Sequence, residues 1–204
     1  MLLGAPAAAS AACAGAEVES ADQNTVALEQ SILCLINERR ANVGAGPVRP
    51  NGKLAQAAAR HSNDMVSRGF FSHNSPGGGT FIDRITATGY MRGARSWLVG
   101  ENLAWGAGSL STPANLVDAW MKSPPHRANL LRGRFREIGL SGVRGTPSDA
   151  GQESGITVSS EYGYRALSKK SARKARKARK ARKARKARKA RKARQARRAR
   201  ARRS

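Results

Sequence analysis

Three titratable side chains stand out against apolar or glycine-rich surroundings: His73, Glu101 and His126, which are 28 and 25 positions apart. Imidazole and carboxylate groups can hold divalent cations and transfer protons near neutral pH. The spacing matches none of the short motifs of metal or nucleophile sites, such as HExxH, paired CxxC or GxSxG. Spacing alone therefore leaves two alternatives open, namely one shared site or three separate structural roles.

Hydrophobic periodicity and capping signals predict the elements that would carry these residues. Asn24 and Asn51 are candidate caps of two amphipathic helices, and Gly69 ends the second helix. Thr80 and Asp83 resemble a capping box at the start of a short helix, and a Ser-Thr-Pro run further on marks another helix start. The stretches EIGLSGVRG and SGITVSSEYGY alternate as two strands. Helices first and strands last predict an α+β layered domain rather than a doubly wound one.

Three other side chains, and His126 itself, also receive a structural interpretation. Trp105 and Trp120 are predicted to be core aromatics, and His61 lies on the apolar face of the second helix, which favours a buried, hydrogen-bonded histidine. In the stretch KSPPHRANLL, two prolines are expected to fix the chain just before a short helix that carries His126. A buried His126 with only a stabilising role is the alternative to a site residue.

The stretches FSHNSPGG, GENLAWGAGSLSTP, AWMKSPPHRANLL and FREIGLSGV occur in this order. They closely resemble bacterial members of the CAP superfamily, named for cysteine-rich secretory proteins, antigen-five and pathogenesis-related proteins. The resemblance covers about residues 31–163 and implies a secreted α-β-α sandwich with a central cleft lined by two histidines and two acidic residues. His73, Glu101 and His126 match three of these positions, and the second acidic position falls on Asn115.

Asn115 departs from the family pattern. Its neutral amide can hydrogen-bond a histidine but supplies no negative charge to hold a cation or accept a proton. A divalent metal such as zinc would then have His73 and His126 as ligands, with Glu101 either as a third ligand or as the group that orients one imidazole. A site with one carboxylate is weaker than a site with two.

Three functional interpretations follow from these residues. The favoured one is a secreted, non-enzymatic binding module whose cleft holds a small molecule, a lipid or a glycan. The second is a metal-dependent hydrolase, a protease or esterase, in which the ion acidifies water and Glu101 acts as general base. No nucleophilic serine or cysteine beside a base is evident in the sequence. The third is a DNA-binding protein that acts through its basic tail.

The N-terminal stretch MLLGAPAAASAACAGA, residues 1–16, is predicted to be a truncated export signal that lacks a positive first region. A disordered alanine-rich end is the alternative. In an exported chain the only two cysteines, Cys13 and Cys34, are expected to form a disulfide, which requires cleavage after Ala11 rather than after Ala16. No segment reaches the roughly 18 apolar residues of a membrane span.

Charge divides the chain into a body, predicted to extend over residues 24–165, and a tail of residues 168–204. Residues 169–204 contain 22 of the 38 Lys and Arg residues and none of the 13 acids. The tail repeats Ala-Arg-Lys, and repulsion between its like charges predicts disorder until an anion neutralises them. Expected partners are an anionic cell-envelope polymer, an acidic lipid surface or DNA. We therefore expect a secreted protein associated with the cell envelope.

Overall fold

A computed structural model describes residues 13–149 and 154–173, together with 176–178, 180, 181, 184, 185, 187 and 188 of the tail. The predicted export signal, apart from residues 13–16, lies outside these residues. The chain divides into two compact units, the first comprising residues up to Arg92 together with Trp97–Tyr164, and the second comprising Gly93–Ser96 and the residues from Arg165 onwards. No helix in the part of the chain that the structure describes is long and apolar enough to cross a membrane.

A four-stranded sheet with the order β1-β3-β4-β2 forms the middle layer of the first unit. Its short strand β1 pairs in parallel with β3, and β3 pairs antiparallel with β4. The strands are β1 (Arg49–Pro50), β2 (Ala94–Ala107), β3 (Glu137–Arg144) and β4 (Gly155–Leu167). Strands β3 and β4 confirm the two strands predicted there, but burial does not alternate along them, since the first nine residues of β4 are all buried. Strand β2 was not predicted, because its glycine-rich sequence has no regular alternation.

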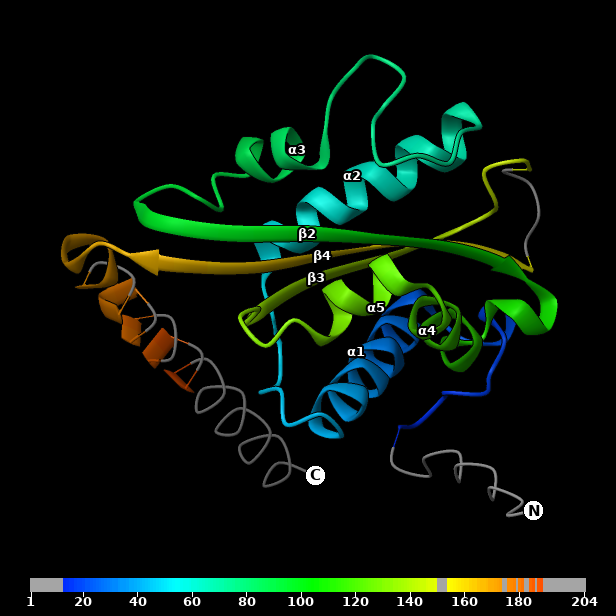
Figure 1. Cartoon of the computed structure of the whole chain (residues 1–204), viewed down its shortest axis with the longest axis horizontal. Helices are drawn as coiled ribbons and strands as arrows, with labels where there is room; N and C mark the ends of the chain where they lie inside the picture. The colour runs from blue at the N-terminus through cyan, green and yellow to red at the C-terminus, as the bar shows by residue number, and fades with distance from the viewer. Residues whose placement is uncertain are drawn as a thin grey trace, which may run out of the picture. The chain divides into compact units, whose positions relative to one another are not determined.

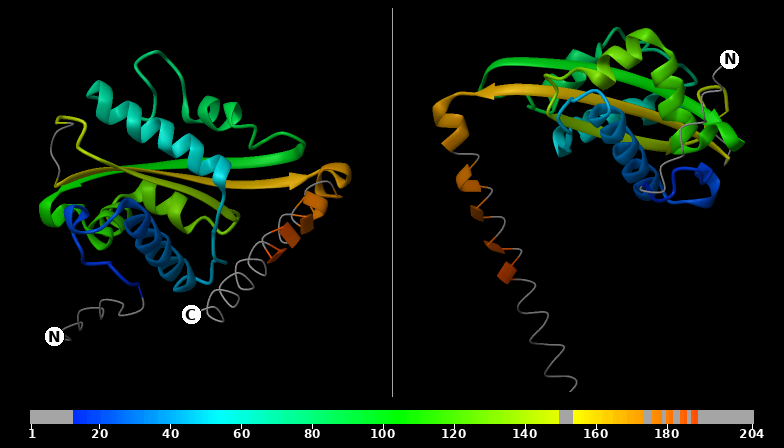
Figure 2. Two further views of the ribbon diagram at one scale, coloured as in Figure 1. Left: turned by 180° about the vertical axis from the view of Figure 1, so that it is seen from behind. Right: turned by 60° about the horizontal axis from the view of Figure 1, so that its bottom comes forward.

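Helices cover both faces of the sheet, with α2 and α3 on one side and α1, α4 and α5 on the other (Figures 1 and 2). The chain also contains two short 3-10 helices, η1 and η2. The helices are α1 (Thr25–Ala41), α2 (Gly52–Arg68), α3 (Phe81–Ala87), α4 (Pro113–Lys122), α5 (Pro124–Leu131), η1 (Ser20–Asp22) and η2 (Gly108–Ser111). This arrangement confirms the predicted α+β fold, an α-β-α sandwich.

Local capping sets the ends of the helices, as the sequence predicts. The Asn24 side chain accepts a hydrogen bond at the start of α1, and Asn51 does the same for α2. Gly69 ends α2 in the left-handed conformation with φ 66°, which a glycine adopts without a steric penalty. Thr80 and Asp83 form the complete capping box of α3. The prolines expected just before α5 instead form its first turn.

Strand β2 is an edge strand, and side chains from α4 and α5 cover its outer carbonyl groups. The Trp120 indole donates to the Leu103 carbonyl over 2.9 Å, and the Asn129 amide donates to the Glu101 carbonyl over 3.1 Å. These bonds satisfy backbone groups that an uncovered edge would leave open to another strand. Trp120 is a core residue as predicted, but the prediction for Trp105 was wrong, because this side chain near the end of β2 is 46% exposed.

Two apolar clusters hold the layers together. The larger joins α1, α4 and α5 to β3 and β4, and the smaller joins α2 and α3 to the other face of the sheet. On that second face, a Cβ atom on Gly139 of β3 would lie 2.0 Å from the Ala55 nitrogen of α2. Helix α2 therefore packs directly on the strand backbone, at a distance that only glycine permits.

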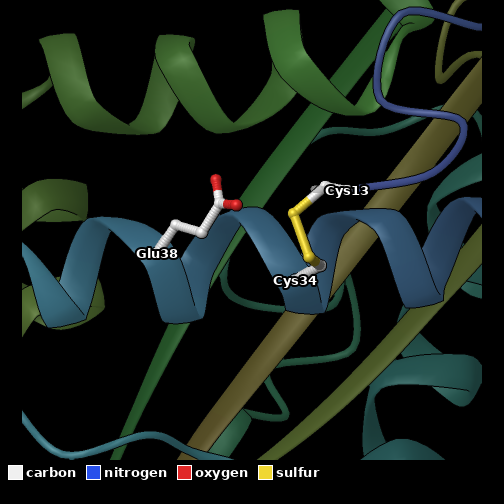
Figure 3. Close-up of side chains that lie close together, drawn as sticks. All are labelled: Cys13, Cys34 and Glu38. Atoms are coloured by element: carbon white, nitrogen blue, oxygen red, sulfur yellow. A yellow bond between two sulfur atoms is a disulfide. The ribbon is translucent and has the colours of Figure 1, made fainter. Parts of the chain in front are cut away.

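The predicted disulfide between Cys13 and Cys34 is present, with the two Cα atoms 5.7 Å apart. Figure 3 shows it between the N-terminal segment and α1, with Glu38 further along the helix. Cys13, Cys34 and Glu38 lie close enough to resemble a metal site. The two sulfur atoms bond each other, however, so the cysteines form a cross-link. Cys13 and Ala16 are buried, and the Ala16 carbonyl accepts a bond from the Ala114 nitrogen. The body therefore includes residues 13–23, and cleavage after Ala16 would remove half of the disulfide.

The second unit contains the start of the basic tail. Residues 169–173 are helical, and so are the other tail residues that the structure describes. The Ser168 hydroxyl accepts a hydrogen bond from the Ser171 nitrogen, which is an N-cap contact. Ala, Arg and Lys all favour helix, which agrees with the helical backbone of the described tail residues. The disorder predicted for the tail stays a prediction. The rest of the tail lies outside the described residues.

Candidate functional site

Glu101 is the buried centre of a charged cluster on β2. Its side chain is 1% exposed, and both of its oxygens are engaged. Oε1 lies 2.7 Å from Nδ1 of His73, and Oε2 accepts a hydrogen bond of 2.6 Å from the Arg84 guanidinium. Burial alone would raise the pKa of Glu101, but hydrogen bonds from His73 and Glu161 and the positive charge of Arg84 hold it below its ordinary value. Glu101 is therefore an ionised carboxylate.

Two side chains hold His73 in place through the loop backbone. The Arg84 guanidinium donates to the His73 carbonyl over 2.9 Å, and Nε2 of the fully buried His61 donates to the neighbouring Ser72 carbonyl over 2.8 Å. His61 is thus a buried, hydrogen-bonded histidine, as predicted. Because Nδ1 of His73 donates to Glu101, a neutral ring carries its free lone pair on Nε2. The His73 side chain is 51% exposed, so a ligand can reach it.

His126 approaches His73 from α5, on the other side of the β2 edge. The two ring centroids are 6.5 Å apart. The Asn102 amide donates to the His126 carbonyl over 2.9 Å, and Asn129 in turn donates to the Asn102 oxygen over 3.1 Å, so that α5 is tied to β2. Partial burial, together with the nearby His73, lowers the pKa of His126. The structure thus brings His73, Glu101 and His126 together, although they are far apart in the sequence.

Asn115 lies outside this cluster. It is exposed in the first turn of α4, where its amide donates to the Ser109 carbonyl over 2.7 Å. Among the residues that the structure describes, its side chain makes no hydrogen bond to His73, Glu101 or His126. Asn115 therefore serves as a local brace of the turn before α4.

Sequence reasoning missed two residues of the site, Arg84 and Glu161. Glu161 lies on β4 and is fully buried beside Glu101. The available signal was an acid in the middle of SGITVSSEYGY, a strand that otherwise consists of small, apolar and neutral residues. An isolated acid in a buried strand needs a partner. Nothing local indicates that the partner is on β2, because sheet pairing is set by the whole fold.

The two imidazoles of the cluster can be reached from the solvent, since the His73 side chain is 51% exposed and His126 is partly exposed. Three hollows on the first unit are lined by other residues: one between α1, α2 and β3, one beside α4 and α5, and one under the N-terminal segment. His73 and His126 therefore meet the solvent as a pair of imidazoles over a buried carboxylate.

The donor set fits a weakly held divalent metal with the two imidazoles as ligands. His73 would bind through Nε2, since Nδ1 is bonded to Glu101. Glu101 already has both oxygens engaged, so it orients the His73 ring and does not act as a ligand. A bound ion would polarise a ligand or acidify a water molecule at this surface.

Comparison with known proteins agrees with this architecture. A family model described as CAP, the cysteine-rich secretory protein family, matches residues 33–160. The Bacillus subtilis protein YkwD is 34% identical over 124 residues, which is 61% of this chain and 46% of YkwD. The B. subtilis membrane protein YlbC is 31% identical over 112 residues, which is 55% of this chain and 30% of YlbC. The chain therefore spans less than half the length of these curated relatives.

Two solved structures share the fold. One is an extracellular protein containing an SCP domain from Bacillus anthracis, with 28% identity and a TM-score of 0.54, covering 69% of this chain and 41% of that one. The other is an outer surface protein of Borrelia burgdorferi, with 21% identity and a TM-score of 0.54, covering 66% of this chain and 90% of that one. The family match extends over more than half of the sequence and confirms the resemblance of its four motifs. The chain belongs to the CAP, or cysteine-rich secretory protein, family.

Proposed function

We propose that this protein is an extracellular binding module, whose paired imidazoles hold a ligand and whose tail attaches it to anionic surfaces. Two observations support the extracellular location. The similar Bacillus anthracis structure is that of an extracellular protein. The Cys13–Cys34 disulfide is of a kind that persists in oxidising compartments, and no cysteine among the described residues is free.

The bonding of Glu101 is the observation that carries the binding proposal. A general base must be free to take a proton from a substrate or a water molecule. Glu101 instead has one oxygen on His73 and the other on Arg84, and its side chain is almost inaccessible. This geometry suits an orienting group that presents His73 to a ligand, and it favours binding over metal-dependent hydrolysis.

Zinc is a suitable probe of the imidazole pair, because it binds neutral histidine nitrogen. We expect calorimetric titration of the full chain with zinc to show one weak site, lost in both His73→Ala and His126→Ala. Asn115→Ala is the matched control and should bind zinc as the unaltered chain does. Zinc affinity that survives both histidine changes would refute the site. Cleavage of peptide or ester substrates that depends on His73 would favour the hydrolase instead.

The tail carries the proposal of surface attachment. It concentrates 22 positive charges in 36 residues without an aromatic side chain, so it can attract polyanions but has no side chain for base stacking. For an exported protein, the favoured partner is an anionic cell-envelope polymer or an acidic lipid surface. DNA is the alternative partner.

Co-sedimentation can separate these partners. We expect the full chain to bind isolated cell envelopes and to be released by salt, while a chain ending at Ser168 stays in solution. A chain with the tail Lys and Arg residues replaced by Gln is the control for length. Equal binding by this control would overturn the electrostatic attachment. A preference for DNA over envelopes at matched salt would favour the DNA-binding function.

A further inference from the structure

The buried carboxyl group of Glu161 is the feature of this site that the binding proposal does not use. Glu161 is fully buried on β4, where it pairs with Gly139 of β3. Neither of its oxygens accepts a hydrogen bond from any donor among the described residues. Among the described residues, the carboxyl group of Glu101 lies within hydrogen-bonding reach of it.

Two carboxyl groups can hydrogen-bond only if one of them carries a proton, because an ionised carboxylate is solely an acceptor. Glu101 receives hydrogen bonds from His73 and Arg84, both of which favour its charged form. Glu161 receives none, and ionising it would place a second buried negative charge beside the first. The guanidinium of Arg84, which lies close to both carboxyl groups, already bonds Glu101 directly. The proton therefore resides on Glu161.

We infer that Glu161 is a positioning residue: its protonated carboxyl group donates a hydrogen bond to Glu101 and so fixes the carboxylate that orients His73. This role rests on the proposed binding function of the imidazole pair. It gives the site a second acid, from β4, although the position expected from the family is the neutral Asn115. A protonated acid adds a hydrogen-bond donor and no charge.

The charged and titratable groups that face the two carboxyl groups agree with a proton on Glu161. Arg84 comes from α3, His73 from the loop before it, and His61 from α2. Burial raises the pKa of Glu161 well above its ordinary value, and the negative charge of Glu101 and their shared hydrogen bond raise it further, with only partial opposition from Arg84. Burial also lowers the pKa of His61, which favours its neutral form.

Infrared difference spectroscopy on the full chain at pH 7 tests the proton directly. We expect the carbonyl stretch of a protonated carboxyl group in the unaltered protein and its loss in Glu161→Gln. Asp83→Asn, which alters an exposed acid in the capping box of α3, is the control and should keep the band. A spectrum of the unaltered protein without this band would overturn the proposal.

Nitrogen NMR of His73 tests the positioning role. Glu161→Gln keeps a neutral donor to Glu101, so we expect the Nδ1–H tautomer of His73 to persist. Glu161→Leu removes the donor at similar size, and we expect the tautomer signal to weaken. If Glu161→Leu folds and leaves the signal unchanged, Glu161 does not position His73.

The pH dependence of unfolding provides a readout if the leucine variant does not fold. The folded-state pKa of Glu161 is raised, so the folded protein binds this proton more tightly than the unfolded chain. The associated stability is present below the unfolded pKa of about 4.5 and is lost as the pH rises through the folded value. We expect urea unfolding to show this decline in the unaltered protein and a flatter profile in Glu161→Gln. Equal profiles would contradict the proposal. None of these measurements needs a ligand, so they can fail or succeed independently of the binding function.

Discussion

Arg40 offers a sharp test of how the fold holds α5, and with it His126, in place. This residue of α1 is fully buried, and its guanidinium donates five hydrogen bonds to four backbone carbonyls. The acceptors lie before β1, in the last turn of α5 and between α5 and β3: Gly46, Leu130, Arg132 and Phe135. Arg40 therefore ties three parts of the chain together at the carboxyl end of α5.

Arg40→Met keeps the length of the side chain and removes every donor. The bonds to Leu130 and Phe135 are wholly buried. Each carbonyl left without a partner costs about 1–3 kcal/mol, and the partly buried ones cost less. We expect a loss of roughly 4 kcal/mol, a large part of the 5–15 kcal/mol that stabilises a typical domain. Arg40→Lys retains the positive charge and three donors. Its stability should therefore lie between that of the unaltered protein and that of Arg40→Met.

Urea unfolding followed by tryptophan fluorescence measures this loss as a shift of the midpoint at constant slope. The preceding residue provides the control. Arg39 pairs with Asp118 at 2.9 Å, but both side chains are substantially exposed. We expect Arg39→Met to cost less than about 1 kcal/mol. The reasoning fails if Arg40→Met costs no more than Arg39→Met.

Three further predictions concern the cross-link, the packing of α2 and the imidazole pair. Replacing Cys13 and Cys34 together with Ser opens a loop of 21 positions, and scanning calorimetry should show a loss of about 3 kcal/mol that reduction of the unaltered protein reproduces. Gly139→Ala forces β3 away from α2, so it should destabilise by more than about 3 kcal/mol or prevent folding, which circular dichroism would reveal. His73→Phe removes one cause of the lowered pKa of His126, so an NMR titration should show this pKa closer to its ordinary value; an unchanged or lower pKa would contradict the coupling.

Features that depend on neighbouring residues could be predicted from the sequence. The caps Asn24, Asn51 and Thr80 act within three positions of their partners, so the starts of α1, α2 and α3 were predictable. The disulfide was predictable because Cys13 and Cys34 allow only one pairing. The charge of the tail is likewise a property of composition.

Strand β2 and the exposure of its side chains could not be predicted from neighbouring residues. Its glycines hid the strand, and its edge position, set by the order of the sheet, left Trp105 exposed rather than in the core. Asn115 showed the same limit, because at this position expected from the family the side chain hydrogen-bonds the Ser109 carbonyl. Exposure and orientation depend on which elements pack nearby, and the sequence does not record this locally.

The sequence by itself determined the family, the capped starts of α1, α2 and α3, the basic tail and the identity of His73, Glu101 and His126 as residues of interest. Only the tertiary structure decided that Arg84 and Glu161 belong with them. Helix caps and charge runs act over a few residues, whereas the partner of a buried acid is chosen by the pairing of strands that are 60 positions apart. The proton on Glu161 follows from that pairing. It places a second buried carboxyl group beside the ionised Glu101, and the nearby negative charge keeps this second group protonated.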